Sequence, residues 1–114
     1  MLATLTALAE PNRLRIIALL RQGPRPVGSI GHRLKIRQPQ VSKHLSVLKN
    51  AGLVEVHADA QQRVYDLRQQ AFAELDAWLE PYRRFWDHRL DALERRLDSS
   101  ELPSAKGKPK GIPK

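Results

Sequence analysis

The stretch that decides the fold runs from Gln38 to Val56 and reads QPQVSKHLSVLKNAGLVEV. Its first part carries apolar residues at the spacing of one helix face: Val41, Leu45 and Leu48. Pro39 suits the first turn of that helix, because the N–H that proline lacks would have no partner there. Gly52 supplies the left-handed backbone that commonly follows a helix. We therefore predict a helix from Gln38 to about Asn50.

Beyond Gly52 the apolar period changes from that of a helix to the alternation of strands. Leu53–His57 and Arg63–Arg68 are rich in Val, Tyr and Leu, and the polar segment Ala58–Gln62 separates them. This pattern predicts a two-stranded hairpin with a five-residue loop. A lone hairpin is marginal in water, so we expect Tyr65 and Leu67, on one strand face, to anchor it to the helices.

Three shorter helices are predicted before this stretch, at Ala3–Ala9, Pro11–Gln22 and Pro26–Leu34, followed by a brief connection from Lys35 to Arg37. The apolar residues that give these helices their spacing are, in chain order, Leu2, Leu5 and Leu8, then Leu14, Ile17, Ala18 and Leu20, then Val27, Ile30 and Leu34. The expected fold is therefore mainly α, with one small β-hairpin.

A long helical segment is predicted after the hairpin, from Gln69 to Asp98. Its apolar residues recur at spacings of three, four or seven: Phe72, Leu75, Leu79, Tyr82, Trp86, Leu93 and Leu97. Recurrence over this length indicates a packing partner, so we expect these residues, with Leu5 and Leu8, to form a dimer interface. Pro81 either kinks the segment or begins a second helix, and the sequence leaves both open.

Five of the six aromatic residues fall between Phe72 and Trp86. They fit either the core of a dimer or an aromatic pocket for a small apolar inducer. We expect the dimer core, because aromatic side chains pack a large area at a low cost in entropy.

The net charge of +8 is spread unevenly along the 114 residues. No acidic residue occurs from Pro11 to Val54, whereas nine basic ones do, and Gln69–Asp98 carries seven acids and five bases. A long basic stretch without carboxylates indicates a surface that approaches polyanions; a solvated face that keeps the protein soluble is the alternative. The last residues are rich in Ser, Pro, Gly and Lys, which predicts a disordered basic tail at 99–114 after one domain at 1–98.

Several classes of protein are excluded by composition. The chain has no cysteine, which removes disulfides, thiolate metal sites and cysteine nucleophiles. Its longest apolar run, Ile16–Leu20, is far too short to cross a membrane, and no basic patch followed by an apolar core begins the chain. We therefore expect a cytoplasmic protein without a membrane partner. The four histidines are scattered over different elements and no phosphate-binding loop or catalytic set is visible, so we expect no enzyme and no cofactor.

The order of helix, helix, short helix, turn, helix and hairpin is that of a winged helix-turn-helix. The second helix of the motif presents its polar face to the DNA major groove, and the hairpin tip approaches the minor groove or backbone. The residues that we expect to contact DNA are Arg37, Gln38, Gln40, Ser42, Lys43 and His44 on the helix, and Gln61, Gln62 and Arg63 on the hairpin. Ordinary solvated polar residues are the alternative interpretation.

Four stretches resemble the ArsR-type family of winged-helix repressors: LAEPNRLRIIALL, QPQVSKHLSVLKNAGLVEV, QQRVYDLR and LDAWLEPYRRFWDHRLDALERRL. The resemblance covers roughly residues 1–98, and VSKHLSVLKNAGLV is its most specific motif. It implies a homodimer that binds double-stranded operator DNA, represses transcription by occlusion and is released by an inducer. It also implies that Gln40, Ser42, Lys43, His44 and, in the hairpin, Arg63 contact DNA.

Two departures from the family pattern matter. Many members sense metals through cysteines or Asp/His clusters; here Val27–Leu34 has no cysteine, and the last helix offers a single histidine, His88, among carboxylates. We therefore expect a cysteine-free branch without a metal site. Arg37 stands where members often place a small polar helix cap, which makes the cap geometry uncertain and suggests that Arg37 reaches a phosphate.

The alternative function is non-specific nucleic-acid binding, driven by the basic surface and the basic tail.

Overall fold

The computed structural model describes residues 1–99, of which Ser99 is described only by its backbone. Apart from Ser99, which ends the last helix, the predicted tail at 99–114 therefore lies outside the described residues. The elements are α1 (Leu2–Leu8), α2 (Pro11–Leu20), β1 (Arg25–Pro26), α3 (Val27–Leu34), α4 (Gln38–Asn50), β2 (Val54–Asp59), β3 (Gln62–Leu67) and α5 (Gln69–Ser99). The chain divides into two compact units, Met1–Trp78 and Leu79–Lys114, so that α5 begins in the first unit and continues into the second.

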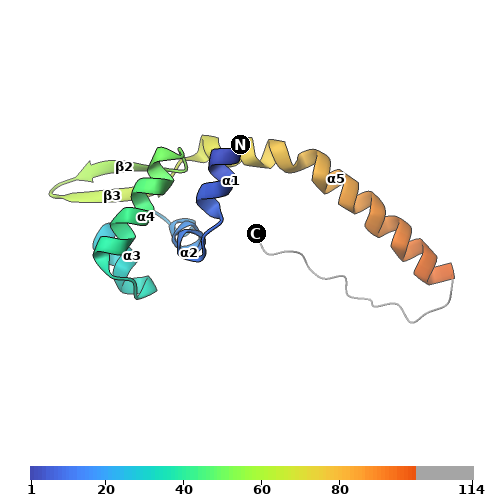
Figure 1. The fold of residues 1–114 in the computed structure, drawn as a ribbon, viewed down its shortest axis with the longest axis horizontal. Helices are drawn as coiled ribbons and strands as arrows, with labels where there is room; N and C mark the ends of the chain where they lie inside the picture. Colours follow the sequence, from blue (N-terminus) through green and yellow to red (C-terminus); the bar gives the residue numbers. More distant parts are fainter. Residues whose placement is uncertain (100–114) are drawn as a thin grey trace. The chain divides into compact units, whose positions relative to one another are not determined.

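The first unit is a winged helix-turn-helix, as predicted. Figure 1 shows the four short helices gathered together, with β2 and β3 extending from them as a wing. The core is built from all four helices, the base of the wing and the start of α5. Its buried residues are Ala7, Ile16, Ile17, Leu19, Leu20, Ile30, Val41, Leu45, Leu48, Leu53, Val54 and Ala71.

The sheet differs from the prediction in two respects. It has three antiparallel strands in the order β1-β3-β2, because Arg25 and Pro26 pair with Tyr65 and Val64. A two-residue strand has no periodicity of its own, so the sequence pattern did not reveal it. The predicted five-residue loop is also wrong: the strands extend to Asp59 and Gln62, which leaves a two-residue turn. Tyr65 and Leu67 pack against the core, which confirms them as anchors.

Helix α2 buries a different face from the one predicted. Ile16 and Leu19 are buried beside the expected Ile17 and Leu20, whereas Leu14 is 51% exposed and Ala18 is exposed. Every residue from Ile16 to Leu20 is apolar, so periodicity alone could not choose between adjacent faces of this helix. Contacts with α1, α3, α4 and β3 made the choice.

In α1 the buried residue is Ala7, whereas Leu2 and Leu5 of the predicted set are exposed. The predicted faces of α3 and α4 agree with the structure. Val41, Leu45 and Leu48 of α4 are fully buried, Ile30 of α3 is buried, and Val27 and Leu34 pack against the same core. Helix α4 has the predicted bounds, and α5 continues through Pro81, so that proline does not begin a second helix.

Candidate nucleic-acid interface

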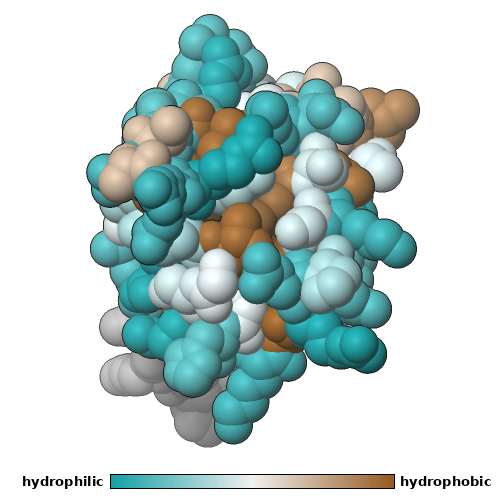
Figure 2. Space-filling view, turned by 90° about the vertical axis from the view of Figure 1, so that its left-hand side faces the viewer, coloured by the Kyte–Doolittle hydropathy of each residue, from teal (hydrophilic) through white to brown (hydrophobic). Residues whose placement is uncertain are grey.

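Helix α4 divides cleanly into an inner and an outer face. Val41, Leu45 and Leu48 have no exposed area, whereas Val47 is 39% exposed. The polar residues Gln38, Gln40, Ser42 and Lys43 are exposed, as predicted. Figure 2 looks at the side of the molecule that carries the wing, and hydrophilic side chains cover most of it. Burial of the inner face therefore fixes which polar side chains of α4 are presented to a partner.

His44 does not lie on the outer face as predicted. Its side chain is only 16% exposed, and its Nδ1 atom lies 3.9 Å from the Glu10 carboxylate. Glu10 precedes α2 by one residue and is far from His44 in sequence, so no local pattern could reveal this contact. Of the residues expected to contact DNA on α4, His44 is the one that also faces the interior.

Three local features fix the turn between α3 and α4. Lys35 ends α3 in the left-handed conformation, with φ of 59°. A Cβ atom on Gly31 would lie 2.9 Å from the Ile36 carbonyl oxygen, so only glycine permits this close approach. The Arg15 guanidinium donates to the Leu34 carbonyl over 2.8 Å. These contacts fix the direction in which α4 leaves the turn.

Arg37 is the N-cap residue of α4 and is exposed. It makes no side-chain cap hydrogen bond; its carbonyl instead accepts from the backbone N–H groups of Gln40 and Val41. No acidic residue stands in the first turn of α4. The positive end of the helix dipole and the Arg37 guanidinium therefore add their charges on the side where a phosphate would approach.

The tip of the wing carries the other predicted DNA contacts. Gln61, Gln62 and Arg63 are exposed, and Ala60 adopts a left-handed conformation with φ of 59° to form the turn. The wing also carries an exposed pair that the sequence did not suggest, in which His57 Nε2 lies 3.1 Å from the Glu55 carboxylate. The tip of the wing thus carries one acidic residue, Asp59, as well as one basic residue, Arg63.

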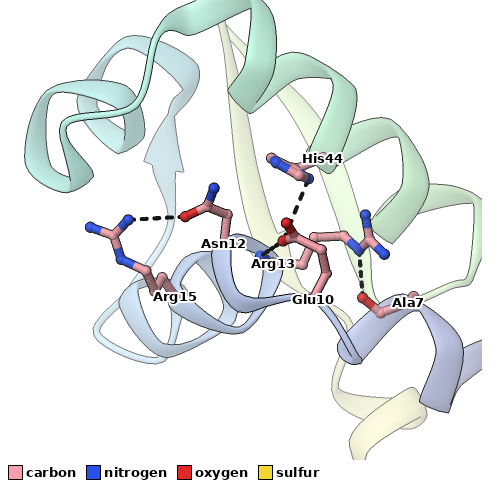
Figure 3. A network of polar contacts seen from close by, with 6 residues as sticks. All are labelled: Ala7, Glu10, Asn12, Arg13, Arg15 and His44. Carbon is pink, nitrogen blue, oxygen red and sulfur yellow. Dashed lines mark hydrogen bonds and ion pairs between the residues drawn. The ribbon is translucent and has the colours of Figure 1, made fainter.

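A polar network joins α1, α2 and α4 beside this surface (Figure 3). Glu10 accepts a hydrogen bond of 2.9 Å from the backbone N–H of Arg13, which caps α2, and the Arg13 guanidinium donates to the Ala7 carbonyl over 2.6 Å. The hydrogen bond from Arg13 is the main cause that holds the pKa of Glu10 below its ordinary value; a bond from the backbone of Asn12 and the charges of His44 and Arg13 act in the same direction. Glu10 is therefore ionised at neutral pH.

The residues predicted for dimerisation fall into two groups. Leu8, Phe72, Leu75 and Leu97 are half-buried, and Leu8 and Phe72 pack against the core of the first unit. The rest are exposed: Leu5, Leu79, Tyr82, Trp86 and Leu93. Three further apolar residues of α5 are exposed: Trp78 and Phe85, which belong to the aromatic group expected in the dimer core, and Leu90, which the prediction did not include. Phe85 contacts Trp86 edge-to-face, and the Arg89 guanidinium lies 5.2 Å from the centre of the Phe85 ring.

Residues 1–99 contain neither a metal-binding cluster nor a membrane-spanning helix. No three His, Cys, Asp or Glu side chains in this range lie close enough together to hold a metal ion. No helix among the described residues is long and apolar enough to span a membrane.

The sequence and fold both match known proteins. The family model described as "Bacterial regulatory protein, arsR family" matches residues 10–56. The chain is 38% identical over 93 residues to the HTH-type transcriptional regulator Rv2034 of Mycobacterium tuberculosis, an alignment that covers 82% of this chain and 84% of the relative. It is 41% identical over 71 residues to the biofilm growth-associated repressor of Agrobacterium fabrum, which covers 62% of this chain and 61% of that protein.

A solved structure supports the same assignment. The solution structure of a homodimeric winged helix-turn-helix DNA-binding domain from Mycobacterium bovis, described as a possible ArsR-family regulator, superimposes with a TM-score of 0.61 at 30% identity. The alignment covers 72% of this chain and 76% of that one. The chain therefore belongs to the ArsR family of bacterial regulatory proteins, and it is a winged helix-turn-helix transcriptional regulator.

Proposed function

We propose that this regulator is a dimeric repressor that binds double-stranded operator DNA with α4 in the major groove. The observation that carries the proposal is the division of α4, which buries Val41, Leu45 and Leu48 fully while its polar residues Gln38, Gln40, Ser42 and Lys43 remain exposed. A major groove is wide enough to admit such a helix. The repressor works in the cytoplasm, where bacterial operator DNA lies, and the proposal includes no catalytic step.

The exposed side chains of α4 suit both kinds of DNA contact. Glutamine pairs with the edge of adenine, a serine hydroxyl can bond to a donor or an acceptor on a base edge, and lysine contacts guanine or phosphate. Arg37 at the start of the helix is placed for a phosphate. In this proposal Gln38 and Gln40 specify bases, whereas Arg37 and Lys43 supply affinity and orientation.

The wing supplies a second contact to the same duplex. Arg63, with Gln61 and Gln62 beside it, lies at the exposed tip of the hairpin. An arginine there suits the adjacent minor groove, whose potential is negative, or the phosphates that border it. Glu55 and Asp66 lie opposite each other toward the base of the wing, whereas Asp59 lies at the tip, opposite Gln62.

Dimerisation is supported by the exposed apolar residues of α5 and by the homodimeric relative from Mycobacterium bovis. A two-fold dimer of helix-turn-helix domains binds a pseudo-palindrome whose half-sites lie about one helical turn apart. We therefore expect two copies of α4 to occupy successive major grooves on one side of the operator. The aromatic residues of α5 then belong mainly to the interface between protomers.

Selection of bound sequences from random DNA tests the proposal, followed by gel shifts of the selected duplex at physiological salt. We expect a pseudo-palindromic site and affinity that falls steeply with salt. The matched control is a duplex of the same composition in shuffled order. Equal affinity for the two duplexes would contradict sequence-specific recognition.

Non-specific binding through the basic tail is the competing function. A chain ended after Asp98 lacks Lys106, Lys108, Lys110 and Lys114 but keeps nearly all of every element that the structure describes. We expect this shortened chain to keep its preference for the selected site and to lose part of its affinity for any duplex. Loss of all affinity would favour the competing function.

Repeating the selection with added metals and small apolar compounds tests whether an inducer releases the DNA.

A further inference from the structure

The contact between Glu10 and His44 joins the start of α2 to the middle of the DNA-facing helix. Both side chains can ionise, and the distance between them shows what kind of contact they make. The separation of 3.9 Å between His44 Nδ1 and Glu10 Oε1 is too long for a hydrogen bond but lies within the range of an ion pair. A neutral imidazole therefore gains little from this carboxylate, whereas an imidazolium is attracted to it.

The two groups are sheltered to different degrees. The His44 side chain is 16% exposed and that of Glu10 is 32% exposed, so solvent screens their attraction less than it screens a pair on an open surface. The exposed pair His57–Glu55 in the wing, where the side chains are 59% and 44% exposed, provides an internal comparison. We expect the charge of His44 to matter more than the charge of His57.

No other carboxylate competes for His44 among the helices packed against α4. Helix α1 carries no ionisable side chain, and α3 carries only the exposed His32 and Arg33. On α2, the guanidinium groups of Arg13 and Arg15 donate to main-chain carbonyls of Ala7 and Leu34.

The remaining element against α4 is β2, in which Glu55 pairs with His57 and Asp59 lies at the wing turn. Glu10 is thus the anion that faces His44. Its pKa is lowered, chiefly by the hydrogen bond from Arg13, so it stays negative throughout the range in which histidine changes charge.

We propose that Glu10 is a positioning residue for the DNA-facing helix and acts through protonated His44, so that operator affinity rises as the pH falls. The inference rests on the proposed function. Protonation ties α4 to the N-terminus of α2 and reduces the reorganisation that DNA binding requires of the exposed Ser42 and Lys43. Phosphates approaching α4 also favour the imidazolium, so proton uptake and DNA binding support each other.

The experiment compares operator affinity at about pH 5.5 and about pH 8 for the wild type, Glu10→Gln, His44→Gln and the double variant. The Glu10→Gln change is chosen because the amide keeps an oxygen that can accept the hydrogen bond from Arg13, so that only the charge is removed. The ratio of affinity at the lower pH to affinity at the higher pH should be about three to five times larger for the wild type than for Glu10→Gln. The other histidines contribute equally to both ratios and cancel.

The double-mutant cycle separates a proton-dependent role from a structural one. We expect coupling between Glu10 and His44 at the lower pH and none at the higher pH. His88→Gln, an exposed histidine of α5, is the matched control and should keep the wild-type pH dependence. Equal pH ratios in the wild type and Glu10→Gln, or the same coupling at both pH values, would overturn the proposal.

A second measurement on the free protein does not depend on DNA. The coupling between Glu10 and His44 in the free energy of unfolding, measured with urea at about pH 5.5 and about pH 8, should be present only at the lower pH. The same coupling at both pH values would overturn the proton-dependent contact itself. Coupling confined to the lower pH, without selective binding to any duplex, would instead contradict the proposed function. Circular dichroism and thermal unfolding confirm that each variant is folded.

Discussion

Helix α4 and the part of α5 beyond Trp78 carry the same kind of apolar pattern but expose it differently. In α4, Val41, Leu45 and Leu48 have no exposed area. In the second unit, Tyr82 is 54% exposed and Trp86 is 59% exposed. Both segments belong to amphipathic helices.

The difference shows that periodicity identifies a surface to be covered without identifying what covers it. The apolar face of α4 meets α2, α3 and β2 of its own chain. Large aromatic side chains left exposed along a helix indicate a partner, because contiguous apolar area in water is costly. Variants of α4 therefore test packing within the chain, and variants of α5 test association between chains.

The largest expected effect is in α4, whose apolar face is covered by its own chain. Leu45→Ala removes a fully buried side chain from the core that carries α4, which should lower the free energy of unfolding by about 3 kcal/mol. Val47→Ala on the same helix is the matched control, because Val47 is partly exposed and should cost well under about 1 kcal/mol. Urea denaturation measures both. Equal losses would mean that the division of α4 is misplaced.

In α5, whose aromatic residues are exposed, Trp86→Ala should weaken dimerisation by about 2 kcal/mol, or roughly thirtyfold in the dissociation constant. Operator affinity should fall with it, although no DNA-facing residue is changed. Sedimentation measures the dimer. His88→Ala, also exposed on α5 but outside the apolar set, serves as the control. An unchanged dimer in Trp86→Ala would place the interface elsewhere.

A smaller effect is expected on the outer face of α4. Lys43→Ala should lower operator affinity, and the slope of log K against log salt should fall by about one unit if Lys43 contacts a phosphate. An unchanged slope with reduced affinity would indicate a base contact. Lys49→Ala, near the other end of the helix, carries the same charge change away from the proposed contacts. Indistinguishable effects of the two variants would argue against a specific role for Lys43.

The smallest effect concerns the turn of the wing. Ala60 has a positive φ, which L-residues adopt at a cost, so Ala60→Gly should stabilise the first unit by about 0.5 kcal/mol once the added freedom of the unfolded chain is subtracted. Ala58→Gly in the adjoining strand should have the opposite sign, at a cost of about 0.5 kcal/mol. Thermal unfolding compares the two. Destabilisation by both would contradict the left-handed turn.

The site was predictable from the sequence where its residues are close together in the chain. The bounds of α4, its inner face and its exposed polar residues all follow from one short stretch with a proline near its start and a glycine after its end. Tyr65 and Leu67 were recognised as anchors in the same way, from alternation within one strand.

What failed depended on distant residues. The strand at Arg25 exists because Tyr65 pairs with it, and the buried face of α2 depends on which neighbours cover Ile16 and Leu19. His44 faces partly inward because it stands three residues after Val41 and four before Leu48, at the spacing of the buried face, and only its contact with Glu10 depends on a distant residue. None of these contacts has a local signature.

The sequence by itself determined the class of the protein and the helix that we propose approaches DNA, because helix periods, end signals and the absence of acids are properties of neighbouring residues. Only the tertiary structure decided which groups of other segments lie beside that helix, such as the Glu10 carboxylate beside His44, since contacts between segments are set by packing. It also left Tyr82, Trp86 and Leu93 exposed within the chain. A single sequence pattern therefore serves both a core and an exposed apolar surface, and the packing of the folded chain distinguishes them.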